Sequence, residues 1–222
     1  MTRSIRRFGV SAFGAILFIA HGVPAAEQDD GKAPAFSAAD LTALPARNWI
    51  TNGGNLYNQR YSRLDQINRG NVQDVKAVWR VGLNGSGVGP GYSQQAQLLF
   101  YEGVLYAVTG DDDVFAVDVE TGKFLWTYEA DVDFKTSVVC CGRLSRGVGL
   151  GDGKIFLGRL DGRLIALDQR SGEVVWDVQA ADPKQGYGIT AAPLYLNNRA
   201  ATIYAGSNEI QRNIIAKATL AL

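Results

Sequence analysis

Cys140 and Cys141 are the only two cysteines of the 222-residue sequence, and they are adjacent within TSVVCCGRLSRGVG (136–149). Neighbouring α-carbons lie about 3.8 Å apart across a trans peptide bond, which is closer than a disulfide normally spans. A bond between the two sulfurs would therefore close a strained, rigid eight-membered ring with a flat, apolar surface. The alternative is a pair of buried free thiols. The redox compartment bears on the choice, because disulfides persist in oxidising surroundings.

The N-terminus is typical of a secretory signal peptide. Three arginines within the first seven residues precede an apolar run over 8–20, and the small residues of VPAA favour cleavage near Ala26. The run is shorter than the roughly 20 residues that span a bilayer, so a retained membrane anchor is the weaker interpretation. We therefore expect residues 1–26 to be removed and the mature protein to be periplasmic or secreted, with no stable membrane span. Export favours the disulfide over the free thiols.

Removal of this segment would limit the chemistry that the chain can perform. His21 is the only histidine, so the mature chain would have no imidazole for a Ser/His/Asp or Cys/His arrangement. The full sequence has 22 basic and 22 acidic residues, and loss of the N-terminal arginines leaves an acidic excess. That balance argues against nucleic acid or an anionic membrane as a partner.

An internal repeat with a period of 50 residues organises the middle of the chain. GVLYAVTGDDDVFAVDVETGKFLW (103–126) aligns without a gap to GKIFLGRLDGRLIALDQRSGEVVW (153–176), with Gly, Asp, Ala and Trp identities in register. The identical pairs are Gly103/Gly153, Asp111/Asp161, Ala116/Ala166, Asp118/Asp168, Gly122/Gly172 and Trp126/Trp176.

Each repeat reads as successive antiparallel strands separated by tight turns. Gly122 and Gly172 fall in TG and SG turns, where a positive φ is needed, and the preceding Asp can cap its own backbone. One such sheet cannot bury both faces, so the units must stack. We predict an all-β fold, an incomplete β-propeller with two recognisable blades plus partial ones, in which each Trp packs against the next blade. A β-sandwich is the alternative.

The motifs AVDVETGKFLW and ALDQRSGEVVW resemble the tryptophan-docking repeats of the eight-bladed pyrroloquinoline quinone (PQQ) dependent alcohol dehydrogenases. The segment NWITNGGNLYNQRYSRLDQINRGNVQDVKAVW (48–79) is similar to the start of the mature enzymes. The resemblance implies a partial quinoprotein propeller over 48–196, preceded by a flexible mature N-terminus over 27–47. It also implies that Trp79 closes the outer strand of an incomplete first blade.

The resemblance assigns cofactor-binding residues. Cys140 and Cys141 match a vicinal disulfide that packs on the quinone face, Arg146 matches an arginine that binds the acidic groups of PQQ, and Thr190 matches a threonine at another carboxylate. A guanidinium suits this role because its fork of donors fits carboxylates. Without the resemblance, Arg146 would pass as an exposed arginine and Thr190 as a strand residue. Gln95 stands where related enzymes place a glutamate.

Other family features are missing from the sequence. Ser145 replaces the asparagine common before the arginine, the Gly-rich turn that supplies a calcium ligand is not found after Thr190, and the catalytic aspartate of a later blade is not encoded. We therefore assign no catalytic and no metal-binding residue, although the family uses calcium with PQQ.

The C-terminal segment resembles a different family. IYAGSNEIQRNIIAK, within 199–222, is similar to the C-terminal segment of acyl-CoA dehydrogenases, and apolar residues from Asn208 onward follow helical spacing. We expect residues 197–222 to form an unrelated tail with an amphipathic helix.

Three functions follow as hypotheses. The first is a fragment of a periplasmic PQQ-dependent alcohol dehydrogenase, an oxidoreductase that passes hydride from primary alcohols to PQQ, with an electron acceptor as further partner; alone it would be inactive. The second is a non-catalytic propeller scaffold of the cell envelope. The third is a remnant of a flavin-dependent acyl-CoA dehydrogenase, supported only by the tail.

Overall fold

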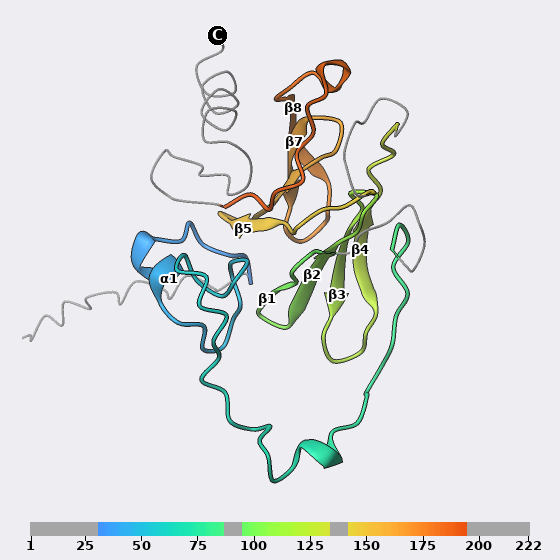
Figure 1. The fold of residues 1–222 in the computed structure, drawn as a ribbon. Coiled ribbons are helices and arrows are strands. Elements are labelled where there is room, and N and C mark those ends of the chain that lie inside the picture. The colour runs from blue at the N-terminus through green and yellow to red at the C-terminus, as the bar shows by residue number, and fades with distance from the viewer. Residues whose placement is uncertain (1–30, 87–94, 134–141, 195–222) are drawn as a thin grey trace, which may run out of the picture. The chain divides into compact units, whose positions relative to one another are not determined.

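Two four-stranded antiparallel sheets form most of the structure, a computed structural model that describes residues 31–86, 95–133 and 142–194 (Figure 1). Each sheet is a simple meander in which consecutive strands pair. The strands of the first sheet are β1 (Leu99–Tyr101), β2 (Val104–Val108), β3 (Val114–Asp118) and β4 (Phe124–Tyr128). Those of the second are β5 (Gly149–Gly151), β6 (Lys154–Gly158), β7 (Arg163–Asp168) and β8 (Val174–Gln179). The predicted β-meanders of the repeat are thereby confirmed, and the two sheets do not close a ring.

The turns explain why the repeat folds in this way. The β1–β2 and β5–β6 hairpins have two-residue loops, and all four loop residues have positive φ. That is the geometry of the type I′ turn, whose twist matches the flanking strands. In the β3–β4 and β7–β8 turns, Gly122 and Gly172 also have positive φ, and the Asp118 carboxylate accepts a hydrogen bond from the Thr121 amide at 2.8 Å.

Tryptophan docking joins the two sheets, as the sequence predicted. Trp126 of β4 donates its indole N–H to the carbonyl of Gln169 at 3.0 Å. A Cβ atom at Gly172 would lie only 2.5 Å from the Trp126 ring, so the turn must be glycine for the indole to pack on it. Gln169 in turn donates to the Tyr106 hydroxyl at 3.0 Å, which ties β2 to the same turn.

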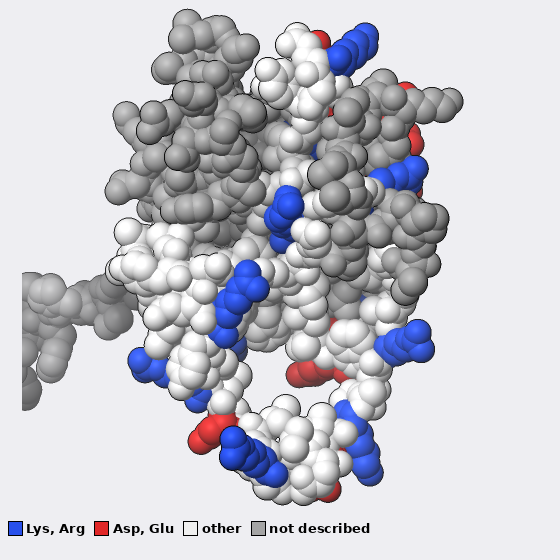
Figure 2. All heavy atoms as spheres, in the orientation of Figure 1, with Lys and Arg blue, Asp and Glu red and all other residues white. Residues whose placement is uncertain are grey.

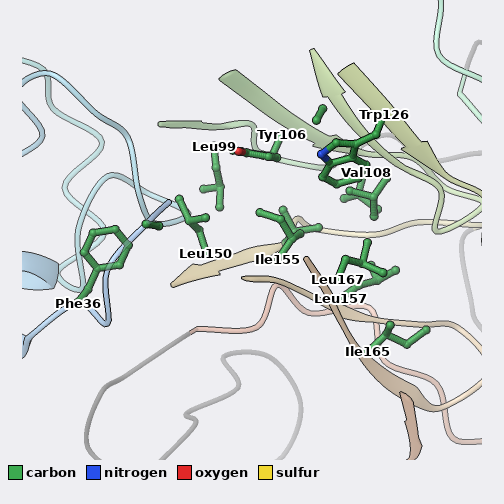
Figure 3. Packing of buried hydrophobic residues seen from close by; sticks show 14 of the residues in the cluster. Phe36, Leu99, Tyr106, Val108, Trp126, Leu150, Ile155, Leu157, Ile165 and Leu167 are labelled. Atoms are coloured by element: carbon green, nitrogen blue, oxygen red, sulfur yellow. The ribbon is translucent and has the colours of Figure 1, made fainter. Parts of the chain in front are cut away.

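A continuous apolar core lies between the sheets (Figure 3). Leu99, Tyr106 and Val108 contribute from the first sheet, and Ile155 and Leu167 from the second; all five are almost fully buried. Side chains alternate along each strand, so the residues that face the neighbouring sheet come from every second position. Burial of this surface is the main free-energy gain that holds one sheet against the other.

Trp79 makes the same contact one repeat earlier. Its indole N–H donates to the carbonyl of Val119 at 2.8 Å, and its ring packs on Gly122. The sequence predicted that Trp79 closes an outer strand, and the structure differs: residues 75–83 belong to no strand and have no ladder partners among the described residues. A strand needs a hydrogen-bonded neighbour, and the described residues offer this segment none, so only the tryptophan contact remains.

The segment before residue 48 is not a flexible terminus over its described part. Phe36 and Leu41 are buried in the main core, and Phe36 packs edge-on against Tyr101 at 6.1 Å. Helix α1 (Ala38–Thr42) begins with a capping box formed by Ser37 and Asp40. The expected flexibility over 27–47 is therefore corrected for residues 31–47, because their apolar side chains cover the β1–β5 end of the core.

Among the residues coloured in Figure 2, the Lys and Arg side chains are spread over this face and do not form one continuous patch. In the described ranges, no helix has the length and apolar character needed to cross a bilayer.

Candidate functional site

Arg146 and Thr190, which the resemblance assigns separately as cofactor-binding residues, lie in contact with each other. The Arg146 guanidinium donates through Nη1 to the Thr190 hydroxyl, and the Arg146 backbone N–H donates to the Thr190 carbonyl at 3.0 Å. The Arg146 carbonyl accepts from the Gln97 amide at 3.2 Å. Three segments distant in sequence therefore meet at this arginine, and its guanidinium is held in one orientation.

Glycines allow the close approach of these segments. Gly147 has a φ of 141° and packs directly against the Asn52 amide, where a Cβ atom would overlap the side-chain oxygen. A Cβ atom at Gly149 would lie 2.5 Å from the Pro193 carbonyl oxygen. The glycines of SRGVGLG thus allow the backbone after Arg146 to pass close to Asn52 and Pro193 before it enters β5.

A cavity of about 600 Å³ opens beside Arg146. Gln95 lines it, so two of the predicted site residues share one cavity, while Thr190 takes part through its bond to the arginine. No carboxylate is among its described lining residues, and both ionisable side chains are arginines. The lining residues are Thr51, Asn52, Asn55, Leu56, Asn58, Arg60, Gln95, Gln97, Arg146, Ala192, Pro193 and Leu194.

This lining can bind an acidic ligand. Two guanidinium groups favour carboxylates, and the amides of Asn and Gln supply neutral donors and acceptors. The donor set therefore fits a small planar acid such as PQQ, whose acidic groups need cationic partners. Cys140 and Cys141 lie outside the described residues, so the predicted ring on the quinone face stays a prediction.

The N-terminal side of this cavity was not predicted from the sequence. Thr51, Asn52, Asn55, Asn58 and Arg60 come from TNGGNLYNQR (51–60), which was used only as a family signature. The high density of amides around two glycines was the available signal. Its spatial neighbour could not be found from local pattern, because the segment contacts Gln97 and Val148 far along the chain.

Ser145, beside the arginine, is buried, and its hydroxyl has no hydrogen-bond partner among the described residues. This serine stands where the resembled family commonly has an asparagine. A buried hydroxyl without a partner costs free energy, so a ligand or water that reaches it would be favoured.

A second hollow, of about 510 Å³, is acidic. Asp111, Asp113, Glu129 and Asp131 line it, and burial raises the pKa of Asp113 above its ordinary value. Arg143 bonds to the Asp111 carboxylate at 2.9 Å at its edge. Within the described ranges, no three His, Cys, Asp or Glu side chains converge in the way that a metal ion requires.

Comparison with known proteins identifies the family. Residues 49–205 match the family model described as PQQ: glucose/ethanol/alcohol dehydrogenase, β-propeller domain. This match continues past residue 196, where the sequence analysis placed the end of the propeller.

Two curated relatives come from Pseudomonas putida. The quinoprotein alcohol dehydrogenase PedH is 42% identical over 159 residues, which are 71% of this chain and 26% of that protein. The quinohemoprotein alcohol dehydrogenase ADH IIB is 38% identical over 158 residues, 71% of this chain and 22% of that protein. The chain therefore spans about a quarter of the length of these relatives.

Solved structures agree on the fold. The quinohemoprotein alcohol dehydrogenase ADHIIG from Pseudomonas putida HK5 superposes with a TM-score of 0.62 at 33% identity, over 70% of this chain and 22% of that one. A europium-containing methanol dehydrogenase superposes with a TM-score of 0.59 at 31% identity, over 66% and 25%. The extent of the family match and the agreement in fold show that this chain belongs to the family of the PQQ-dependent glucose, ethanol and alcohol dehydrogenase β-propellers.

Proposed function

We propose that the chain is the N-terminal part of a PQQ-dependent alcohol dehydrogenase and supplies one wall of its cofactor pocket. The observation that carries this proposal is the Arg146–Thr190 pair beside a cavity with no described carboxylate in its lining. An acidic cofactor is attracted to such a site, whereas an acidic lining would repel it.

The residues of this chain have separate tasks in the proposal. Arg146 binds a carboxylate of the cofactor with its guanidinium, and Thr190 fixes the orientation of that guanidinium. Gln95 hydrogen-bonds the cofactor without adding charge. Cys140 and Cys141, as a disulfide ring, pack on the face of the quinone and keep water from it.

PQQ, when bound, supplies the redox chemistry by accepting hydride from a primary alcohol. The described lining of this pocket offers no carboxylate that could remove the alcohol proton. We therefore expect this chain to be inactive alone, and to need the rest of a propeller for the base and for the calcium ion of the family. An alcohol and an electron acceptor would then be its partners.

The N-terminal sequence supports a periplasmic or secreted location, in which the vicinal cysteines would be oxidised. The resemblance of residues 199–222 to acyl-CoA dehydrogenases supports a junction between unrelated coding segments, although these residues lie outside the described part. Sequencing the locus across codons 190 to 222 tests the junction, and an uninterrupted propeller reading frame there would contradict it.

Titration of the purified chain with PQQ, followed by absorbance, tests the function. We expect saturable binding that Arg146→Gln weakens about tenfold or more, because a charged hydrogen bond contributes roughly 1.5–3 kcal/mol. Arg170→Gln is the matched control, because this arginine lies on the β7–β8 turn and not in the cavity lining. Absence of saturable binding by the unaltered chain would sink the proposal and favour the scaffold hypothesis.

A further inference from the structure

The cavity beside Arg146 has a second polar wall that neither the sequence nor the family comparison assigns. Residues 51–60 form it, and two hydrogen bonds hold the wall in place. Asn52 Nδ2 donates to the Val148 carbonyl at 3.1 Å, and the Gly53 amide donates to Gln97 Oε1 at 2.7 Å. The first of these partners lies two residues beyond Arg146, so the wall and the arginine are fixed relative to each other.

Two buried oxygens in this wall have no hydrogen-bond partner among the described residues: Thr51 Oγ1 and Asn52 Oδ1. Thr51 is only 3% exposed, yet both residues line the cavity. A buried polar atom without a partner is costly, and most such atoms in native proteins are satisfied by water or by a ligand. The side-chain oxygen of Asn52 can only accept a hydrogen bond, whereas the Thr51 hydroxyl can donate or accept one.

Arg60 adds a second positive charge to the same cavity. Among the described residues, its guanidinium bonds only to Asn58 Oδ1, through Nε at 3.1 Å. Asn58 and Arg60 have φ values of 53° and 51°, in the left-handed region that non-glycine residues seldom occupy. The Arg60 amide donates to the Gly53 carbonyl at 2.9 Å, which holds this unusual loop closed. Arg60 is the less usual of the two, because asparagine adopts this region more readily than arginine does.

We infer that the cavity is a two-arginine site that clamps a small ligand bearing at least two carboxylates, one on Arg146 and the other on Arg60. Thr51 and Asn52 bind its polar groups between the two arginines. This inference rests on the proposed function in that PQQ is such an acid, and it extends that function by making Arg60, Thr51 and Asn52 binding residues. All the residues of this inferred clamp belong to the described part of the chain.

Binding of two simple probes to the full chain, measured by calorimetry, tests the clamp. Benzene-1,3-dicarboxylate presents two carboxylates and benzoate only one. We expect Arg60→Gln to weaken the dicarboxylate about tenfold and to leave benzoate within twofold, since benzoate needs only Arg146. Arg63→Gln is the matched control, because this exposed arginine lies three residues after Arg60 and does not line the cavity. Equal binding of the dicarboxylate by Arg60→Gln and the unaltered chain would overturn the inference.

Titration with PQQ separates this inference from the function on which it rests. Binding of PQQ that is insensitive to Arg60→Gln keeps the function and overturns the clamp. Failure to bind PQQ, with dicarboxylate binding that depends on Arg60, keeps the clamp and overturns the function. Binding of neither ligand overturns both.

Thr51→Val provides a further test of the clamp that does not depend on charge. The substitution is close to isosteric and removes a hydroxyl that has no described partner, so the melting temperature of the ligand-free chain should stay level or rise. Dicarboxylate binding should weaken severalfold. A lower melting temperature with unchanged binding would show that the hydroxyl serves the fold, and would contradict its place in the site.

Discussion

Asp112 lies buried where the two sheets meet. One carboxyl oxygen accepts a hydrogen bond from the Leu160 amide at 2.6 Å, and the other has no partner among the described residues. Burial raises the pKa of Asp112 well above its ordinary value of 3.8, against the opposing effects of the Leu160 hydrogen bond and the Arg159 charge. Burial thus disfavours the charged form of this carboxyl group, which is the middle one of three consecutive aspartates.

The raised pKa gives a pH-dependent stability with a definite sign. Between 3.8 and the higher pKa of the folded chain, the unfolded state loses this proton more readily, so the contribution of Asp112 to the free energy of unfolding falls as pH rises. Asp112→Asn removes this loss and keeps an acceptor for Leu160. In urea unfolding, we therefore expect the stability of Asp112→Asn relative to the unaltered chain to increase as pH rises from 4 to 7.

The stability of Asp112→Asn is compared with that of the unaltered chain at each pH, which cancels the contributions of the other titrating groups. This comparison is needed because the pKa values of Asp118 and Asp168 are lowered, so their contributions to stability change with pH in the opposite direction. A stability difference that does not change with pH would show that Asp112 titrates normally.

At this scale the sequence was informative only where a family motif exists. It predicted that Arg146, Thr190 and Gln95 share a site, and the structure brings the first two into contact and places Gln95 in the same cavity. It did not find Arg60 or Asn52, since their role depends on a tertiary contact that leaves no periodic signal in the sequence.

At the scale of elements, the same contact occurs twice: a tryptophan packs on a glycine-containing turn of the next repeat. Trp79 packs on Gly122, and Trp126 packs on Gly172. The strands and turns of both repeats were predictable, because alternation and Gly-containing turns are local signals. The packing of Phe36 against Tyr101 was not, because an isolated aromatic residue among small residues carries no such pattern.

Gly172→Ala should break the tryptophan contact. The added methyl group would lie 2.5 Å from the Trp126 ring, at a residue whose φ is 72°. We expect a loss of about 3 kcal/mol or more in the free energy of unfolding, from backbone strain together with displacement of a large buried side chain.

Gly103→Ala is the matched control for that substitution. Its φ is 84° and a Cβ atom there would meet nothing within 4 Å, so only the backbone term of about 1–2 kcal/mol applies. Thermal or urea unfolding of both variants measures the difference. Equal losses at the two positions would show that the tryptophan contact contributes little.

At the scale of the whole molecule, the described sheets leave apolar surface uncovered. Val174 and Val175 of β8 are each 50% exposed, and Leu125 of β4 is 54% exposed. The chain matches about a quarter of the length of its relatives, and the fold of a propeller buries such surfaces against further blades. The sequence predicted an incomplete propeller because it holds only two recognisable blade repeats, and the two unclosed sheets agree with that prediction.

Uncovered strands of this kind favour association. We expect sedimentation velocity to show that the purified chain self-associates as its concentration rises, and that Val175→Lys on β8 shifts it toward monomer. Lysine on an edge strand opposes pairing with a second edge. Val78→Lys, at a residue that is 87% exposed but outside any sheet, is the control and should change little. A chain that stays monomeric at all concentrations would contradict the expectation.

The two tryptophan contacts also limit the order in which the chain can fold during synthesis. Each indole meets its partner 40 or 43 residues further along the chain, so a sheet that has already left the ribosome cannot be fastened until most of the next repeat has followed. Each sheet can therefore make its tryptophan contact only after roughly one further repeat has been translated.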